Sequence, residues 1–353
     1  MKERVLMKGN EALAYGSLNA GLNAYFAYPI TPSTETPETL AREFGNPVYP
    51  SFRVFLQAAS ELEAVNMTLG AACTGALAMT ATSSPGFSLK QEAISYAAGM
   101  EVPFVVINVN RGGPGLGNLG VEQSDYFQTV KGGGHGGYRL IVLAPNSVQE
   151  MFDLPRIAFN LAFKYRNPVI ILADAFLGQL KEDIHPVPPG NGMAHDTSWA
   201  TLGSENGTRH ILNSLHLDPD DQENHERHLH EKYEKMRDEV ASETFLTDDA
   251  EIVLVSYGIA SRISKNAVSL ARDQGLRLGL LRPITLNPFP YDLVRILAGQ
   301  GKKLLVVELN AGQMVQDVRL AADGTGRVEH LGRLGGNVPS TKQILAKAKE
   351  MMD

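Results

Sequence analysis

The sequence predicts an α/β protein in which a doubly wound parallel-sheet domain is followed by a smaller α/β domain. Three observations lead to this class. Short, continuous apolar runs recur along the chain, which is typical of strands buried on both faces of a parallel sheet. Small-residue helical stretches separate these runs. A stretch rich first in Pro and then in charge, beginning near residue 186, divides the 353 residues into two such parts.

The first part predicts a domain over residues 1–185. Its apolar runs predict strands, and the first two of them end at Pro or Gly residues that interrupt regular structure. Residues 60–72 and 147–163 lie between runs and predict helices. The predicted strands are residues 23–28, 76–82, 103–109, 139–143 and 168–172.

Residues 186–248 predict a connecting segment made of a loop and a polar helix. Residues 186–192 are dominated by Pro and Gly, which excludes a helix or a central strand there. Residues 226–240 predict one exposed, charged helix. Residues 249–353 then predict the second α/β domain. Its predicted strands are 251–258, 276–281 and 303–308, and its predicted helices are about 260–274 and from Ser340 onward.

Composition excludes several classes of function. The chain carries 32 Lys and Arg against 39 Asp and Glu, a net charge of −7. A nucleic-acid or membrane-surface partner would favour a clustered positive charge instead. There is no run of 18 apolar residues, and residues 1–5 do not resemble a signal peptide. The single cysteine, Cys73, excludes a disulfide framework and an iron–sulfur cluster bound by this chain alone. We therefore expect a cytoplasmic protein.

Three predicted strands end in residues that suit an anionic ligand. After the first strand, two prolines fix the backbone and expose Thr31. Residues 82–86 follow the second strand, and Arg111 follows the third. The carboxyl ends of parallel strands are where open α/β sheets bind ligands. Because a guanidinium binds a carboxylate through two parallel hydrogen bonds, we predict a site for a small carboxylate at this edge.

Two carboxylates, Glu61 and Glu63, open the predicted helix at residues 60–72. They are separated by about 200° around the helix, so only one can face inward. A carboxylate in the first turn of a helix is stabilised there, which is an ordinary structural role for either residue. A buried one would be able to hold or share a proton.

Three other motifs have weaker interpretations. Residues 115–120 fit the dinucleotide fingerprint, but no carboxylate follows about 20 residues later, so we interpret them as a mobile loop near a site. The histidines and glutamate at residues 225–230 fit a solvated, charged helix better than a set of metal ligands. Residues 132–137 fit either a phosphate cradle or a plain loop before a strand.

Segments spread over nearly the whole chain together match a known pattern. They are YPITPSTE (28–35), QAASELEAVN (57–66), TSSPGFSLKQE (82–92), VNRGGPGLGN (109–118), EQSDYFQ (122–128), KGGGHGGYRLIVLAP (131–145), NPVIILAD (167–174), LRPITLNPFP (281–290), VVELNAGQMVQDVR (306–319) and RLGG (333–336). The chain resembles the α-type subunit of 2-oxoacid:ferredoxin oxidoreductases, most of all the branched-chain (2-oxoisovalerate) subtype. Residues 190–245 are the weak part of this resemblance.

The resemblance implies an enzyme that oxidatively decarboxylates a 2-oxoacid with coenzyme A and passes two electrons to ferredoxin. Thiamine diphosphate supplies the carbanion chemistry in such enzymes. Residues 1–185 resemble the domain that binds its pyrimidine ring, and residues 249–353 resemble the C-terminal domain of transketolase. No segment resembles the diphosphate-binding domain. The resemblance therefore implies a β-type partner that holds the diphosphate with Mg²⁺, and a ferredoxin-like γ subunit with iron–sulfur clusters.

The resemblance also implies residue roles. Glu61 matches the glutamate that hydrogen-bonds the pyrimidine ring and favours its imino form, whereas Glu63 has no counterpart. Thr31 and Arg111 match substrate-binding residues, and no metal ligand is expected on this chain. The residues expected to contact the cofactor, besides Glu61, are Tyr28, Pro29, Ile30, Ser83, Ser84, Pro85, Gly86 and Phe87. A 2-oxoglutarate or indolepyruvate subtype, a non-catalytic assembly subunit and a nicotinamide dehydrogenase remain as alternatives.

Overall fold

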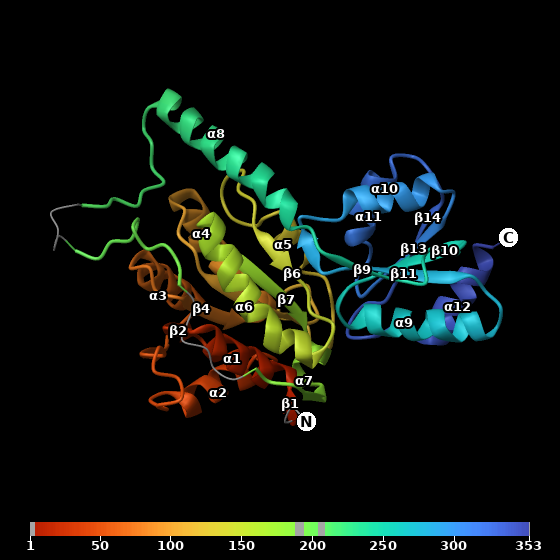
Figure 1. The fold of residues 1–353 in the computed structure, drawn as a ribbon, viewed down its shortest axis with the longest axis horizontal. Helices are drawn as coiled ribbons and strands as arrows, with labels where there is room; N and C mark the ends of the chain where they lie inside the picture. The colour runs from red at the N-terminus through yellow and green to blue at the C-terminus, as the bar shows by residue number, and fades with distance from the viewer. Residues whose placement is uncertain (1–3, 188–193, 204–208, 353) are drawn as a thin grey trace.

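The computed structural model describes residues 4–187, 194–203 and 209–352, which form two α/β lobes (Figure 1). The N-terminal lobe is built on a seven-stranded sheet and the C-terminal lobe on a five-stranded sheet. Of the predicted loop at residues 186–192, residues 188–192 lie outside the described part of the chain. Among the described residues, no helix is long and apolar enough to cross a membrane.

The seven-stranded sheet has the order β12-β6-β7-β5-β4-β2-β3. Six strands run parallel, and β12 pairs antiparallel with β6 at one edge. Five of these strands lie within a residue or two of the predicted runs, which confirms the doubly wound parallel sheet. The strands are β2 (Ala24–Ala27), β3 (Val54–Gln57), β4 (Ala78–Thr82), β5 (Val105–Asn110), β6 (Ile141–Leu143), β7 (Val169–Asp174) and β12 (Thr285–Asn287).

Helices pack around this sheet. The long helix α6 packs against α1, and α3 packs against α4. The contact between α1 and α6 is close at Gly16, where a Cβ atom would lie 2.1 Å from the main-chain oxygen of Phe152. The helices are α1 (Gly9–Ala20), α2 (Glu35–Glu43), α3 (Glu61–Cys73), α4 (Ser84–Met100), α5 (Tyr126–Val130), α6 (Val148–Tyr165) and α7 (Ala175–Gln179). A two-stranded ribbon of β1 (Val5–Lys8) and β8 (Lys181–Ile184) completes the lobe.

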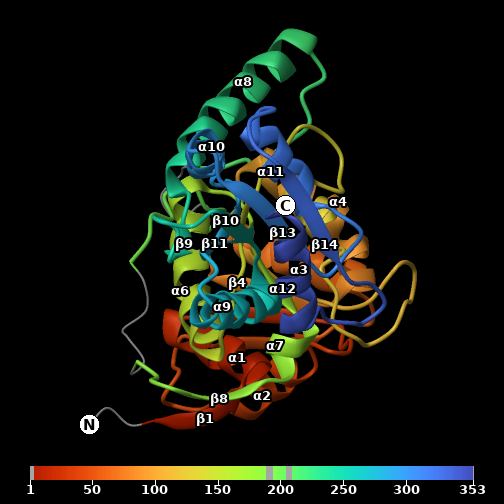
Figure 2. The same cartoon turned by 90° about the vertical axis from the view of Figure 1, so that its right-hand side faces the viewer.

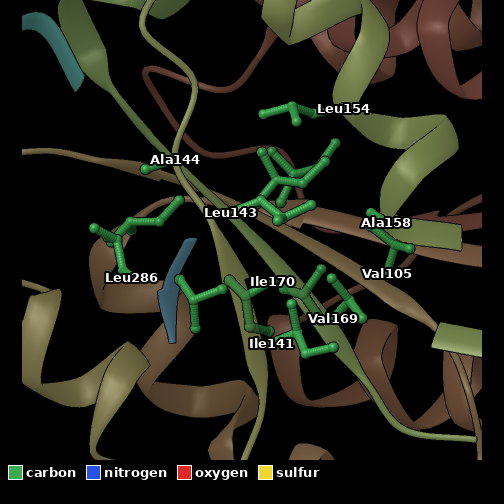
Figure 3. Close-up of a cluster of buried hydrophobic side chains, with 14 of the residues drawn as sticks. Val105, Ile141, Leu143, Ala144, Leu154, Ala158, Val169, Ile170 and Leu286 are labelled. Carbon is green, nitrogen blue, oxygen red and sulfur yellow. The ribbon is translucent and has the colours of Figure 1, made fainter. Parts of the chain in front are cut away.

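An aliphatic cluster in the core of the N-terminal lobe lies where the central strands meet α6 and β12 (Figure 3). Side chains of β5, β6 and β7 are fully buried, as expected for parallel strands covered on both faces. Side chains from α6 and from β12 close this cluster. Its labelled members are Val105, Ile141, Leu143, Ala144, Leu154, Ala158, Val169, Ile170 and Leu286.

The connecting segment contains a longer helix than the sequence predicts. Helix α8 (Pro219–Met236) begins seven residues before the predicted start, and the short helix η1 (Arg237–Glu239) follows it. The earlier start has a local cause, because Asp218 caps the helix at the amides of Asp220 and Asp221, and Pro219 suits the first turn. Figures 1 and 2 both show α8 on the outside of the molecule.

The C-terminal lobe has the strand order β14-β13-β10-β11-β9. Each sheet has one edge strand that comes from another part of the chain. β9, from the connecting segment, pairs with β11, and β12, from the C-terminal part of the chain, pairs with β6 of the N-terminal sheet. The strands are β9 (Ser242–Phe245), β10 (Ile252–Val255), β11 (Leu278–Pro283), β13 (Lys303–Glu308) and β14 (Val328–Gly332). The helices are α9 (Gly258–Asp273), α10 (Tyr291–Gly299), α11 (Met314–Ala322) and α12 (Thr341–Glu350).

Candidate active site

Three neighbouring strands of the N-terminal sheet end at one edge, and the predicted anion site lies there. β2, β4 and β5 are adjacent and parallel, so their carboxyl ends lie at the same side. Thr31 lies in the turn after β2, Ser83 follows β4, and Arg111 directly follows β5. Arg111 Nη1 donates a hydrogen bond to the main-chain oxygen of Thr31 over 2.7 Å. The structure therefore brings together the two residues that the sequence predicts for substrate binding.

Arg111 is held by main-chain atoms and keeps one buried donor unused. Its side chain is 7% exposed. Nη2 donates to the main-chain oxygen of Leu116 over 3.2 Å, and the Arg111 amide donates to Ser84 Oγ. Nε is buried and has no hydrogen-bond partner among the described residues. A buried donor without a partner costs about 1–3 kcal/mol, so this arrangement suits a ligand that brings an acceptor, such as a carboxylate.

Glu61 and Glu63 have opposite environments at the start of α3. Glu61 is 7% exposed, whereas Glu63 faces solvent. Ser60 caps the helix by accepting the Glu63 amide, and the Glu63 carboxylate in turn accepts the amide of Ala59 over 2.9 Å. Glu63 thus has the ordinary helix-start role. Glu61 is the one carboxylate of the pair that is directed into the protein.

The Glu61 carboxylate lies against the first turn of α4. A Cβ atom on Gly86 would come within 2.6 Å of Glu61 Oε1 and within 2.2 Å of Thr82 Oγ1. Only glycine fits this position without displacing one of those groups. Ser84 in the same turn accepts the main-chain amide of Arg111, so residues 82–86 contact both the Glu61 carboxylate and the backbone of Arg111.

The other predicted residues of this turn differ in their accessibility. Ser83 Oγ is buried and has no partner among the described residues. Ser84 Oγ instead donates to the carboxylate of Asp125 over 2.6 Å. Pro85 is half-buried, and Phe87 is fully buried in the hydrophobic core. Phe87 therefore supports the turn from the core, and its predicted contact with the cofactor stays a prediction.

The turn after β2 faces outward. Tyr28 is 39% exposed, Pro29 and Thr31 are exposed, and Ile30 is half-buried. The turn is held at the site edge by the hydrogen bond from Arg111 to the Thr31 oxygen. Its side chains are accessible in this chain to a ligand or to another protein chain.

The structure adds two buried charged residues that the sequence prediction did not select. Asp125 accepts hydrogen bonds from Ser84 and Asn108, and burial raises its pKa while these bonds act in the opposite direction. Lys90 in α4 is fully buried. The burial of Lys90 has a signal in the sequence. Lys90 follows Phe87 by three residues, which places both side chains on the same, buried face of the helix. No comparable pattern marks Asp125.

Residues 112–120 form a loop beside Arg111 that also contacts the C-terminal lobe. The Glu122 carboxylate accepts the amides of Gly113 over 2.7 Å and of Gly335 over 2.9 Å. Arg111 Nη2 bonds to Leu116 within this loop. An isolated bridge at Val121 follows the loop, not the helix that a dinucleotide site requires. The loop thus lies next to the site and is fixed from the other lobe.

The two remaining motifs lie away from this edge. His225 and His228 contact the C-terminal end of α4, through the main-chain oxygen of Gly99 and the carboxylate of Glu101. In the glycine run, the amides of residues 133 and 134 both donate to the Tyr138 hydroxyl. Because those two amides are already paired, the structure favours the plain loop over a phosphate cradle.

Comparisons with known proteins agree with this arrangement. Residues 15–245 match the thiamine diphosphate-binding part of the pyruvate flavodoxin/ferredoxin oxidoreductase family, and residues 250–344 match core domain II of pyruvate:ferredoxin oxidoreductase. Ketoisovalerate oxidoreductase subunit VorB of Methanothermobacter marburgensis is 51% identical, over 98% of this chain and 97% of that protein. 2-Oxoglutarate synthase subunit KorA of Methanothermobacter thermautotrophicus is 38% identical over 98% of each chain.

Solved structures show the same fold. 2-Oxoglutarate:ferredoxin oxidoreductase from Magnetococcus marinus is 27% identical with a TM-score of 0.90, and the match covers 100% of this chain and 66% of that one. A split-gene transketolase is 11% identical with a TM-score of 0.60, over 98% of this chain and 97% of that one, and shows the likeness of fold alone. The chain therefore belongs to the 2-oxoacid:ferredoxin oxidoreductase family and is a subunit of a thiamine diphosphate-dependent enzyme.

Proposed function

We propose that this chain is the α-type subunit of a complex that oxidatively decarboxylates a branched-chain 2-oxoacid with coenzyme A, forming acyl-CoA and CO₂ and reducing ferredoxin. One observation carries the proposal: a buried carboxylate, Glu61, packs against the turn at residues 82–86, and Ser84 in the same turn accepts the main-chain amide of Arg111, whose buried guanidinium keeps an N–H without a partner among the described residues. Identities of 49–51% to ketoisovalerate subunits, against 35–38% to archaeal 2-oxoglutarate subunits, favour the branched-chain substrate.

The proposed roles follow from the surroundings of each residue. Arg111 would bind the oxoacid carboxylate through Nε, the donor that the fold leaves unpaired. The exposed side chain of Thr31 would contact substrate or cofactor beside it. Glu61 would hold a proton at the pyrimidine ring, because a carboxylate removed from water makes stronger hydrogen bonds. Asp125, which holds Ser84, would fix the turn between them.

Thiamine diphosphate would supply the carbanion chemistry of decarboxylation. The residues present fit its pyrimidine side, since Glu61 is a buried carboxylate and Ser83 Oγ is a buried hydroxyl without a partner in the described part of the chain. Tyr28, Pro29, Ile30 and residues 84–86 would complete this side. We propose that residues 1–185 form the pyrimidine-binding domain, 186–248 the connection and 249–353 the transketolase C-terminal-like domain.

Partner subunits would supply the remaining parts. A β-type subunit would hold the diphosphate with Mg²⁺, and a ferredoxin-like γ subunit would carry iron–sulfur clusters, since this sequence has one cysteine and a cluster needs several ligands. The packed pair α3 and α4 exposes Leu62, Met67, Leu89 and Tyr96, and both helices begin beside the site, at Glu61 and Ser84. Covering such apolar side chains favours association, so we propose this face for the β-type subunit.

The complex would work in the cytoplasm, where coenzyme A and ferredoxin are available.

The variant Glu61→Gln tests the proposed function. It should lower the rate of oxoacid-dependent ferredoxin reduction by about 10²- to 10⁴-fold, the usual contribution of a positioned acid–base group. Glu63→Gln is the matched control, because Glu63 lies two residues away and faces solvent. Native mass spectrometry of the anaerobically purified complex should show the same subunits in both variants. A Glu61→Gln complex with near-normal activity would contradict the proposal.

Substrate preference is tested separately. The KorA relatives and the Magnetococcus structure favour 2-oxoglutarate as the second candidate substrate. The ratio of kcat/KM for 2-oxoisovalerate to that for 2-oxoglutarate decides between them, because a dicarboxylate needs a second cationic contact and a branched aliphatic acid needs an apolar pocket. A preference for 2-oxoglutarate would overturn the branched-chain assignment and leave the reaction class intact.

A further inference from the structure

Lys90 is a fully buried lysine beside the proposed catalytic glutamate, and no role described so far uses it. It lies on the inner face of α4, between that helix, strand β4 and the start of α3. A buried ammonium group is rare in proteins unless it is paired, because its removal from water is unfavourable. Its presence here requires a physical explanation.

The Lys90 ammonium connects the first residue of α3 to the adjacent strand. Nζ donates to the main-chain oxygen of Glu61 over 3.2 Å and to Thr80 Oγ1 over 3.0 Å. Thr80 lies in β4, two residues before Thr82, whose hydroxyl lies in the same crowded space as the Glu61 carboxylate. The lysine therefore holds Glu61 from its main-chain side while Gly86 and Thr82 enclose its carboxylate.

The electrostatic environment of Lys90 points to the same residue. Burial lowers the pKa of Lys90 to about 7, and the negative charge of Glu61 acts in the opposite direction. Lys302 is a useful contrast, because its buried ammonium donates to three main-chain oxygens, of Thr247, Asp248 and Ala250, and needs no carboxylate.

We propose that Lys90 is a positioning residue for Glu61: it fixes the first residue of α3 against β4 and places a positive charge behind the carboxylate that contacts the cofactor. The inference rests on the proposed role of Glu61. A lysine with a purely structural role would be expected to have its protons paired within one element or loop, as Lys302 has. Lys90 instead joins the three elements that form the Glu61 side of the site.

Three variants separate this role from ordinary stabilisation. Lys90→Met keeps the length of the side chain and removes its charge and both hydrogen bonds. Lys90→Gln keeps a donor without a charge. Lys302→Met is the matched control, because it removes another buried ammonium, that of a lysine only 7% exposed, from the C-terminal lobe. Each is measured in the complex reconstituted with its partner subunits, and the melting temperature of each complex reports its folding.

We expect Lys90→Met to lower kcat by at least about tenfold while the KM for the oxoacid changes by less than about twofold, since Arg111 is untouched. Lys90→Gln should lie between Lys90→Met and the wild type. The circular dichroism of bound thiamine diphosphate, which reports the state of its pyrimidine ring, should change in Lys90→Met in the same direction as in Glu61→Gln. Lys302→Met should keep the kcat and the dichroism of the wild type, whatever its melting temperature.

Two results would overturn the inference. One is a Lys90→Met complex with wild-type kcat and dichroism. The other is a loss of kcat that only parallels a lower melting temperature, as in Lys302→Met, with unchanged dichroism. The activity of the Glu61→Gln complex shows whether the role of Lys90 or the proposed function itself has failed. If Glu61→Gln is active, the proposed function fails; if it is inactive while Lys90→Met behaves as the wild type, the role of Lys90 alone fails.

Discussion

Replacing Arg111 with lysine should weaken oxoacid binding without unfolding the chain. Lysine keeps the positive charge but has a single nitrogen in place of the planar guanidinium. In the structure, Nη1 and Nη2 bond the main-chain oxygens of Thr31 and Leu116, and Nε is the buried donor left for a ligand. One nitrogen cannot replace all three. Losing one charge-assisted hydrogen bond to the substrate corresponds to about 1.5–3 kcal/mol, or about a 10- to 150-fold increase in KM.

Arg282 provides the matched control. It is 2% exposed, but all of its nitrogens are paired: Nη1 and Nη2 with Glu150 at 2.8 Å each, and Nε with Glu243 at 3.0 Å. These bonds join β11 to α6 and β9, away from the strand ends that form the site. Arg282→Lys should therefore lower the melting temperature by a few degrees, as expected for a loss of about 1–2 kcal/mol, and leave KM unchanged.

The assay is steady-state reduction of ferredoxin by the complex over a range of 2-oxoisovalerate concentrations, with thermal melting in parallel. We expect kcat of the Arg111→Lys complex to stay within about threefold of the wild type at saturating substrate, because Glu61 is unaffected. An unchanged KM would refute the assignment of Nε to the substrate. An equal increase in KM for Arg111→Lys and Arg282→Lys would show that the effect is a general consequence of losing a buried guanidinium.

Two further predictions concern Gly86 and Asp174. Gly86→Ala should lower kcat by at least about tenfold with little change in melting temperature, because the added carbon displaces Glu61 or Thr82. Gly299→Ala is the control and should leave kcat unchanged, because a Cβ atom at Gly299 meets nothing within 4 Å. Burial raises the pKa of Asp174 to about 6 from 3.8, so the unfolded chain releases this proton at lower pH than the folded one. The free energy of unfolding should thus fall as pH rises from about 4 to about 6, by up to about 3 kcal/mol, and Asp174→Asn should remove this part of the slope in chemical denaturation; an equally steep slope in the variant would contradict the prediction.

The sheet of the N-terminal lobe could be predicted because its strands carry their signal locally. The runs at residues 105–110 and 169–174 are apolar at nine of their twelve positions, since both faces of these strands are buried. The meeting of Thr31 and Arg111 could also be predicted, because strand ends of a parallel sheet share one edge. The opposite environments of Glu61 and Glu63 follow from helix geometry, although which of them is buried does not.

The pairing of the two edge strands β9 and β12 could not be predicted. β9 and β12 are three or four residues long, and each pairs with a strand distant in sequence, so nothing in their own residues identifies the partner sheet. The full burial of Phe87 could not be predicted for a similar reason, because it depends on how α4 packs. The burial of Asp125 depends on Ser84 and Asn108, which lie 41 and 17 residues away in sequence.

The unpaired atoms at the site indicate the direction from which a ligand must approach. Ser83 Oγ, Asn110 Nδ2 and Arg111 Nε are all buried without partners among the described residues, and all lie at the ends of the adjacent strands β4 and β5. Single unpaired atoms such as Thr129 Oγ1 occur elsewhere, so one alone does not identify a site. Three on the ends of neighbouring strands, each unfavourable by about 1–3 kcal/mol, favour this edge as the place where a ligand binds. Phe87 and the core are buried behind this edge, whereas the turn after β2 is exposed, so we expect a ligand to approach from the side of that turn.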